Sequence, residues 1–210
     1  MSKDVHVLLM TPIPSSATYN YPPTLPCPSP AQIFSFNSAL AAHAKAADYE
    51  AALALLDGME GEGVKPDLIS YNTAINALGR GGQCARALDL LRKLPELGKS
   101  PDGYTYTAGI SACAEAGDAE NALSLLSELR ASGHKLQTLP FSKTIAACEK
   151  AGRWQEALST FDEISHAGLP HNALTTNLVM RACLDSGEVE QSIGFLTKLV
   201  AQLNGRDGSK

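Results

Sequence analysis

Two similar stretches of the sequence carry side chains suited to recognising a polar ligand. They are GVKPDLISYN at residues 63–72 and GKSPDGYTYT at residues 98–107. Asp67 and Asn72 of the first stretch correspond to Asp102 and Thr107 of the second. Carboxylate, carboxamide and hydroxyl groups form hydrogen bonds of defined direction, which recognition of a polar edge requires. The aspartates also fit ordinary turn and helix-cap chemistry, so both interpretations stay open at this point.

The sequence contains no pattern typical of catalysis or metal binding. There is no CxxC pair among the five cysteines, no HxxxH among the five histidines and no HxE followed by a CxxC. Cys113, Cys148 and Cys183 are spaced 35 residues apart beside apolar neighbours, and we expect them to pack inside helices. No nucleophile has an organised base. We therefore expect no enzyme, no cofactor, no metal and no small-molecule substrate.

The composition is that of a globular protein, with 44% hydrophobic and 19% charged residues among 210. No run of 18 apolar residues predicts a membrane span. The net charge of −5 argues against a protein that coats nucleic acid through uniform basicity, although it leaves room for a local basic track. Residues 1–32 are rich in Pro, Ser and Thr and are expected to form a disordered leader. An organelle-targeting segment is the alternative, but its Arg-rich amphipathic pattern is missing.

The two stretches belong to a 35-residue repeat that runs through the rest of the chain without a gap. The units are Ile33–Asp67, Leu68–Asp102, Gly103–Gln137, Thr138–Asn172 and Ala173–Asp207, with a tail at 208–210. Numbering the places in each unit from 1 to 35, place 20 is Ala52, Ala87, Ala122 and Ala157 in the first four units. Place 8 is Leu40, Ile75, Ile110, Ile145 and Met180. So many matching columns are not expected by chance.

Each unit is predicted to form two helices. The first helix is expected to begin at place 3, with N-caps at Ser35, Ser70, Thr105 and Thr175, and with Pro140 in the fourth unit. A break follows at Gly82, Gly117, Gly152 and Gly187, and the second helix ends at Gly63, Gly98, Gly133 and Gly168. One such hairpin cannot bury its apolar face alone, whereas stacked neighbours can. The sequence therefore predicts an all-α solenoid whose first helices line one surface.

The period of 35, the motif GVKPD before ISYNTAI, and CEKAGRWQEAL at residues 148–158 together resemble the P-type repeats of pentatricopeptide repeat proteins. The resemblance covers residues 33–207. It implies a right-handed α-solenoid of about five repeats that binds single-stranded RNA, one base per repeat. It also implies a role in RNA processing, stability or translation in a mitochondrion or chloroplast; the cytoplasm and nucleus are the alternatives. No membrane partner is expected.

The resemblance assigns roles to four places of each unit. Base-stacking residues at place 2 are Phe34, Ile69, Tyr104, Leu139 and Leu174, for which packing at the helix start is the alternative. Base-recognition pairs at places 5 and 35 are Asn37 with Asp67, Asn72 with Asp102, Thr107 with Gln137, Ser142 with Asn172, and Asn177 with Asp207. Asp207 is followed by no helix that would hold it, so the fifth site rests on Asn177. Phosphate contacts at place 13 are Lys45, Arg80 and Lys150, which also suit a helix C-terminus.

These pairs predict a base preference. An Asn–Asp pair resembles a uracil reader, with cytosine next, and Ser142 with Asn172 resembles an adenine reader; the Thr107 and Gln137 pair is assigned no base. The expected ligand is 5′-(U/C)(U/C)NA-3′. Glu115 and Asp185 occupy place 13 in the third and fifth units and break the basic track. They motivate the alternative function, a scaffold that binds other proteins and has little RNA affinity.

Overall fold

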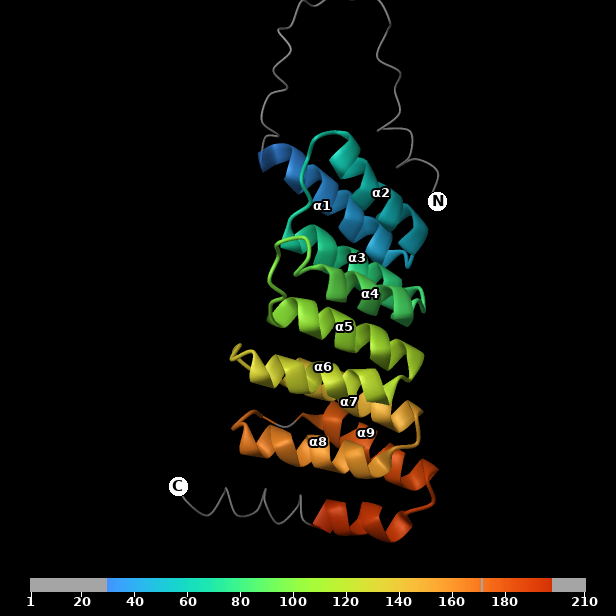
Figure 1. Ribbon diagram of the computed structural model, residues 1–210. Helices are drawn as coiled ribbons and strands as arrows, with labels where there is room; N and C mark the ends of the chain where they lie inside the picture. Colours follow the sequence, from blue (N-terminus) through green and yellow to red (C-terminus); the bar gives the residue numbers. More distant parts are fainter. Residues whose placement is uncertain (1–29, 171, 198–210) are drawn as a thin grey trace, which may run out of the picture.

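The structure is a computed structural model that describes residues 30–170 and 172–197. Its helices in chain order are α1 (Pro30–Lys45), α2 (Tyr49–Gly61), α3 (Leu68–Arg80), α4 (Cys84–Lys93), α5 (Gly103–Ala116), α6 (Ala119–Ala131), α7 (Thr138–Lys150), α8 (Trp154–His166) and α9 (Ala173–Asp185). A further helix begins at Val189 and continues to the last described residue. The described residues contain no strand, and the chain is an α-solenoid. Helix follows helix from one end of Figure 1 to the other.

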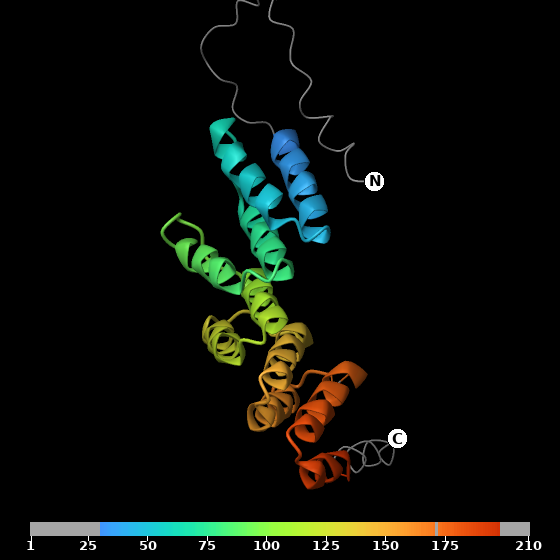
Figure 2. The ribbon, with the colours of Figure 1, turned by 90° about the vertical axis from the view of Figure 1, so that its right-hand side faces the viewer.

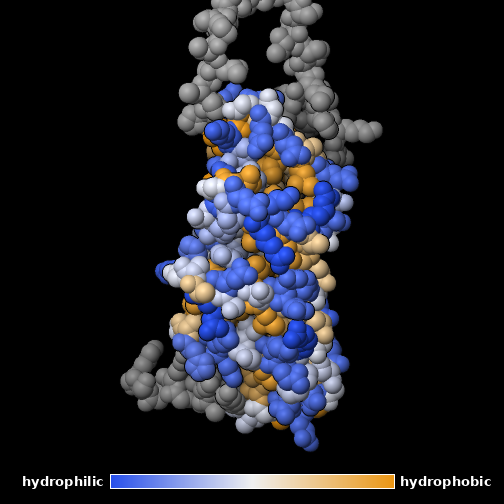
Figure 3. Space-filling model, in the orientation of Figure 1, coloured by the Kyte–Doolittle hydropathy of each residue, from blue (hydrophilic) through white to orange (hydrophobic). Residues whose placement is uncertain are grey.

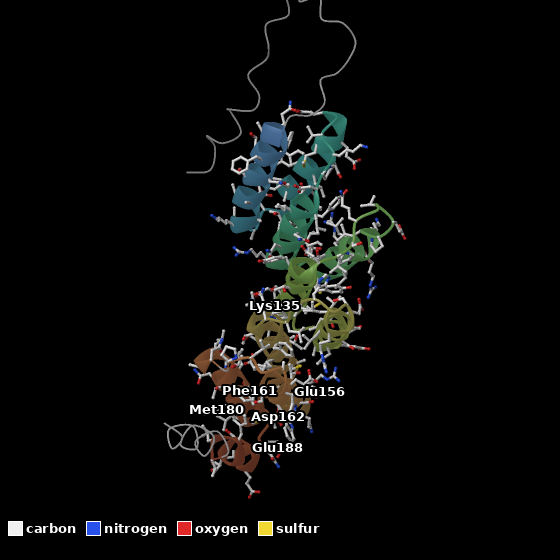
Figure 4. All side chains as sticks on the ribbon, turned by 90° about the vertical axis from the view of Figure 1, so that its left-hand side faces the viewer. Lys135, Glu156, Phe161, Asp162, Met180 and Glu188 are labelled. Carbon is white, nitrogen blue, oxygen red and sulfur yellow. The ribbon has the colours of Figure 1, made fainter. Side chains whose placement is uncertain are left out.

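The helices form two layers. The first helices of the units, α1, α3, α5, α7 and α9, pack against one another in sequence. The second helices α2, α4, α6 and α8 pack on the first helices and meet one another through long side chains, such as Arg130 of α6 and Glu163 of α8. Figure 2 shows the two layers edge-on, and in Figure 4 Met180 of α9 marks the first-helix side while Glu156 of α8 marks the other. The predicted pairing of two helices per unit is confirmed.

The core lies between the two layers and follows the repeat columns. The place-20 alanines and the place-8 residues Leu40, Ile75, Ile110 and Ile145 are 0% exposed. Cys113, Cys148 and Cys183 are also 0% exposed, which confirms that they pack inside helices. Small place-20 side chains let the second helix approach the first helices closely, and the larger place-8 side chains fill the space between units.

The turns between helices confirm the predicted glycines. All eight predicted turn glycines have φ between 67° and 79°, a left-handed conformation that Gly adopts without a Cβ penalty. The second helix of the second unit departs from the pattern, since α4 ends at Lys93 and is followed by turns up to Gly98. Pro95 explains the early end, because proline has no N–H for the helical hydrogen bond and its ring crowds the preceding turn.

The predicted starts of the first helices are wrong by three residues. Helices α3, α5 and α9 have their N-caps at Asp67, Asp102 and Asn172, each of which accepts a hydrogen bond from the N–H of the third helical residue. Ser70, Thr105 and Thr175 are those third residues, and their hydroxyls bond back to complete a capping box. Ser35 and Pro140 likewise lie inside α1 and α7.

The boundary of the predicted leader is also corrected. Helix α1 begins at Pro30, so residues 30–32 are helical rather than part of a disordered segment. Proline is well tolerated at a helix start because its missing N–H has no helical partner there. The rest of the predicted leader, Asp207 and the tail at 208–210 lie outside the described residues.

Candidate nucleic-acid interface

A groove of about 810 Å³ runs along the first-helix face over α3 and α5 and reaches α7. Its wall includes the polar side chains Asn72, Thr107 and Arg80. Gly79 and Ala112 also line it, at the point where α3 and α5 approach most closely: a Cβ added to Gly79 would lie 2.8 Å from the Ala112 Cα. The groove therefore has polar groups along its sides and backbone at its base.

One large apolar side chain per unit projects from the start of each first helix into solvent. The exposed fractions are 74% for Phe34, 62% for Ile69, 72% for Tyr104, 51% for Leu139 and 58% for Leu174. Side chains packed at a helix start would be buried, so the alternative interpretation of place 2 does not hold. Because successive first helices lie side by side, the five side chains form a row with one apolar surface per repeat.

The first polar pair, Asn37 with Asp67, lies between α1 and α3. Asn37 Nδ2 donates to Asp67 Oδ1 at 3.2 Å, and the second carboxylate oxygen is 3.4 Å away. Ser70 Oγ lies 2.7 Å from Asn37 Oδ1 and 2.9 Å from Asp67 Oδ1, so its single hydrogen is shared between these two acceptors. The amide thus has a partner within hydrogen-bond distance at each end, the carboxylate at its NH₂ and the hydroxyl at its carbonyl. Asp67 caps α3, as one interpretation predicted, and also accepts a hydrogen bond from Asn37.

The second pair, Asn72 with Asp102, is arranged like the first, but its amide makes a longer hydrogen bond to the carboxylate. Asn72 Nδ2 lies 3.4 Å from Asp102 Oδ1. Thr105 Oγ1 donates to Asp102 Oδ1 at 2.8 Å, and no bond from Thr105 to Asn72 is present in the described part of the chain. Asn72 Oδ1 is buried and has no hydrogen-bond partner among the described residues. Asn72 lines the groove, but this oxygen is itself buried, so the second site contains an unpaired acceptor beneath the groove surface.

The two carboxylates have lowered pKa values. Burial by itself raises the pKa of Asp67, but bonds from the Ser70 N–H, the Ser70 hydroxyl and the Asn37 amide together lower it below its ordinary value. The pKa of Asp102 is lowered in the same way, against burial, by Thr105 and Asn72. Both side chains are therefore charged at neutral pH and act only as acceptors, which fixes the NH₂ end of each Asn.

The third pair, Thr107 with Gln137, is not joined by a hydrogen bond in the described structure. Thr107 Oγ1 donates to the Gly103 carbonyl at 2.6 Å. Gln137 is the N-cap of α7 but makes no side-chain cap bond, because Pro140 at the third position has neither an N–H nor a hydroxyl to offer. A small hollow of about 260 Å³ lies here and is also lined by Lys135, which Figure 4 labels in the turn between α6 and α7.

The fourth pair is not joined by a hydrogen bond among the described residues, and one member of the fifth pair lies outside them. Ser142 is buried and donates to the Thr138 carbonyl at 3.0 Å, while Asn172 caps α9, and no bond between Ser142 and Asn172 is present in residues 30–170 and 172–197. Asn177 is exposed on α9, and Asp207 lies outside the described residues. Of the four predicted pairs whose members are both described, the structure joins the first two by hydrogen bonds.

Glu115, one of the two acidic residues that break the predicted phosphate track, is paired with two lysines of the next unit. Lys143 Nζ lies 3.5 Å from Glu115 Oε1, and Lys150 Nζ lies 3.7 Å from Glu115 Oε2. Lys150 Nζ also donates to the Glu115 backbone carbonyl at 3.1 Å. Glu115 therefore holds two ammonium groups beside the groove rather than leaving an isolated negative charge. Lys45 and Arg80, the other predicted phosphate contacts, are exposed at the ends of α1 and α3.

Charge is divided between the two layers. The first helices carry five Lys or Arg and three Asp or Glu side chains. Helices α2, α4, α6 and α8 carry four Lys or Arg and nine Asp or Glu side chains. Figure 3 shows the second-helix side, where hydrophilic side chains predominate and apolar ones are visible between them. The acidic character of the whole chain thus belongs mainly to the layer opposite the groove.

Family models match most of the chain. The model described as "PPR repeat family" matches residues 31–80 and 66–115, and the model described as "Pentatricopeptide repeat-containing protein" matches residues 107–205. The chain belongs to the pentatricopeptide repeat family. No curated protein matches this pentatricopeptide repeat protein in a comparison of sequences.

Solved structures show the same fold. Pentatricopeptide repeat protein PPR10 from maize is 25% identical with a TM-score of 0.68, over 80% of this chain and 24% of PPR10. PPR10 in complex with an 18-nt psaJ RNA element is 25% identical with a TM-score of 0.69, over 98% of this chain and 31% of PPR10. The PPR domain of protein-only RNase P 1 from Arabidopsis thaliana, in complex with tRNA, is 17% identical with a TM-score of 0.65, over 80% of this chain and 90% of that one. This pentatricopeptide repeat protein spans less than a third of PPR10.

Two further findings concern the described part of this pentatricopeptide repeat protein. None of its helices is long and apolar enough to cross a membrane. Its described residues contain no group of three or more His, Cys, Asp or Glu side chains placed to hold a metal ion. Three residues have contacts that the sequence interpretation missed. Ser70 contacts Asn37, Lys143 lines the groove, and Arg181 of α9 pairs with Glu149 of α7 at 2.7 Å.

Proposed function

We propose that this pentatricopeptide repeat protein binds single-stranded RNA along its first-helix face, one base per repeat, in a mitochondrion or chloroplast. The observation that carries the proposal is the row of five exposed apolar side chains, one per repeat, with a polar pair between neighbours. Bases stack on such apolar surfaces and are read along their polar edges. The RNA bound by PPR10 and the family membership support the same ligand. The proposal assigns binding and no catalysis.

The expected sequence preference is 5′-(U/C)(U/C)NA-3′. At the first two positions an Asn amide, held by a charged Asp, offers one donor and one acceptor to a pyrimidine edge. At the fourth position the small Ser142 leaves room for a purine, and its pairing with Asn172 resembles that of adenine readers. The third position is left open, because Gln137 and Thr107 do not form a pair of known preference.

The affinity of this short solenoid is expected to be modest. Stacking contributes about 1–3 kcal/mol per base, so four bases between five apolar side chains contribute about 4–12 kcal/mol before the costs of association and of ordering the RNA. Three phosphate contacts, from Lys45, Arg80 and Lys150, give a slope of log K against log salt of about −2, at about −0.7 per contact. A dissociation constant in the micromolar range follows.

The test compares a short RNA of the predicted sequence with one in which the first two pyrimidines are purines and the adenine is uracil. Fluorescence anisotropy across a salt series should show tighter binding of the first RNA and a slope near −2. Equal affinities for the two RNAs would refute the proposed sequence preference. Absence of binding to either RNA at low salt would refute the proposed RNA binding. A protein partner is the second candidate, favoured by the acidic second-helix layer, and capture of a partner that survives nuclease treatment would support it.

A recoding experiment tests one repeat at a time. Changing Asn72 to Thr while keeping Asp102 produces a pair that resembles a guanine reader, so the preferred base at the second position should move from uracil towards guanine. Asn76→Thr is the matched control, because Asn76 lies one turn further along α3 on the same groove but outside the pair. An unchanged preference in Asn72→Thr would reject the assignment for this repeat.

A further inference from the structure

Lys143 of α7 is a charged side chain in the groove to which the repeat pattern assigns no role. It occupies place 6 of its unit, where the other units carry the uncharged Ser38, Thr73, Ala108 and Leu178. Lys143 lines the groove, and its ammonium nitrogen lies 3.5 Å from Glu115 Oε1 on α5. The side chain of Lys143 is 35% exposed, so it is partly accessible to solvent. The groove therefore contains a cation outside the places at which phosphate contacts are predicted.

This ammonium group lies where the predicted phosphate track is interrupted. Place 13 is Arg80 in the second unit and Lys150 in the fourth, but Glu115 in the third. Helix α5 packs against α3 on one side and against α7 on the other. Lys143 reaches from α7 to Glu115, so the third unit has a cation beside its place 13 that the fourth unit supplies.

Lys143 is available to a further anion. The ammonium groups of Lys143 and Lys150 share the single carboxylate of Glu115, so the three side chains together carry one net positive charge. An ammonium group has three N–H donors, and Glu115 is the one partner of the Lys143 ammonium among the described residues. Ion pairs that water reaches add little to stability, so a phosphate can join or replace this carboxylate at small cost. Arg80, on the other side of α5, adds a further positive charge to the same groove.

A phosphodiester of single-stranded RNA is the anion that suits this position. Tyr104 and Leu139, two of the exposed apolar side chains proposed to stack bases, line the same groove as Lys143. A backbone that joins bases stacked on neighbouring units therefore runs through the groove that contains this ammonium group. Each phosphodiester carries one negative charge, and contacts between ammonium groups and phosphates supply a large part of the affinity for nucleic acids.

We infer that Lys143 contacts an RNA phosphate at the third unit, where Glu115 replaces the cation of place 13. This inference rests on the proposed RNA binding and goes beyond it, because it adds a phosphate contact from a place to which the repeat assigns none. Glu115 is a positioning residue that holds the Lys143 ammonium group at the groove. A phosphate contact carries no sequence information, so Lys143 should strengthen the binding of different RNA sequences equally.

The test measures dissociation constants over a salt series for the predicted RNA and for its counterpart with the bases exchanged. Lys143→Gln should weaken the binding of both RNAs about 2–5-fold, the effect of one exposed ion contact. It should also make the slope of log K against log salt shallower by about 0.7. Lys143→Arg should keep the slope, because it keeps the charge. Lys93→Gln is the matched control: it removes the same charge from α4 in the opposite layer and should leave the slope unchanged.

A double-mutant cycle with Glu115→Gln separates a phosphate contact from simple neutralisation of Glu115. If Lys143 acts only by neutralising that carboxylate, Lys143→Gln has no effect in the Glu115→Gln protein. A phosphate contact predicts that Lys143→Gln still makes the slope shallower by about 0.7 in that protein. A purely structural role would change the unfolding temperature, followed by circular dichroism, but not the slope.

The outcomes of the inference and of the proposed function are distinguishable. An unchanged slope in Lys143→Gln, or loss of its effect in the Glu115→Gln protein, would overturn the inference while RNA binding stands. A slope in Lys143→Arg as shallow as in Lys143→Gln would also overturn it, because the charge would not be what acts. Failure of both RNAs to bind the unmodified protein at low salt would overturn the proposed function together with the inference.

Discussion

Substitution of Gly79 by Ala tests how closely α3 and α5 approach at the base of the groove. A Cβ at this position would lie 2.8 Å from both the Cα and the Cβ of Ala112. Carbon atoms in contact are separated by about 3.5–4.0 Å, so the two helices must move apart by roughly 1 Å. The obstacle is backbone on the facing helix and cannot rotate away. The strain therefore falls on the packing between the second and third units.

The magnitude follows from two opposing effects. Replacing a helical Gly by Ala stabilises a helix by about 1 kcal/mol, and overpacking costs about 1–3 kcal/mol. We expect Gly79→Ala to lower the free energy of unfolding by up to about 2 kcal/mol. For a chain of this size that is a fall in Tm of up to about 8 °C. Thermal and urea unfolding, followed by far-UV circular dichroism, measure the change.

Gly109→Ala in α5 is the matched control. A Cβ at Gly109 would meet Leu91 Cδ1 at 2.7 Å and Leu125 Cδ1 at 3.0 Å, and these are the ends of flexible side chains that can change rotamer. The higher helix propensity of Ala is then not offset by strain. We expect Gly109→Ala to raise the free energy of unfolding by up to about 1 kcal/mol. If Gly79→Ala unfolds at the same temperature as Gly109→Ala or above it, the close approach of α3 and α5 is refuted.

Three further predictions concern pH and helix caps. The stability that Asp102 contributes is present above its unfolded pKa and is lost as pH falls through its lower folded pKa, so acid unfolding of Asp102→Ala should show a shallower loss below about pH 4 than the unmodified chain. Burial raises the pKa of Cys148 to about 11, so its stabilising contribution should disappear between about pH 9 and pH 11, and its alkylation at pH 8 should be slow until urea is added. Changing Gln137 to Asp together with Pro140 to Thr should give α7 a capping box and raise the free energy of unfolding by about 1 kcal/mol, as measured by urea unfolding. An unchanged free energy of unfolding would show that a missing cap does not limit the stability of α7.

The helix pattern was predictable because it depends on spacing that is visible in the sequence. Glycines at fixed places end helices through their backbone, and the columns at places 8 and 20 are buried in every complete unit. The starts of the first helices were misplaced because the segment from Asp67 to Ser70 has cap-forming side chains at both ends. Which of them is the cap depends on backbone angles: the φ and ψ of Asp67 are −95° and 179°, outside the helical region.

The candidate site was predictable only in outline. The pairing of Asn37 with Asp67 follows from the repeat, but the repeat does not show that the carbonyl of Asn72 is buried without a partner, because burial depends on how neighbouring helices pack. The pairing of Glu115 with Lys143 could not be read from spacing alone, because it requires the angle at which α7 crosses α5. Local chemistry was therefore visible in the sequence, whereas contacts across the junction of two units were not.

The two contacts of Asp67 constrain how the proposed base preference can change. Asp67 orients Asn37, to which the proposed function assigns base recognition, and it also caps the first helix of the next repeat. A substitution at Asp67 that changes the proposed base preference therefore also changes the free energy of unfolding, because it removes the N-cap of α3. Such substitutions are tolerated only where the next repeat remains stable. Gln137 makes no cap bond, so the third repeat is free of this coupling. It is the described junction at which evolution or an engineer can rewrite the target without destabilising the helix that follows.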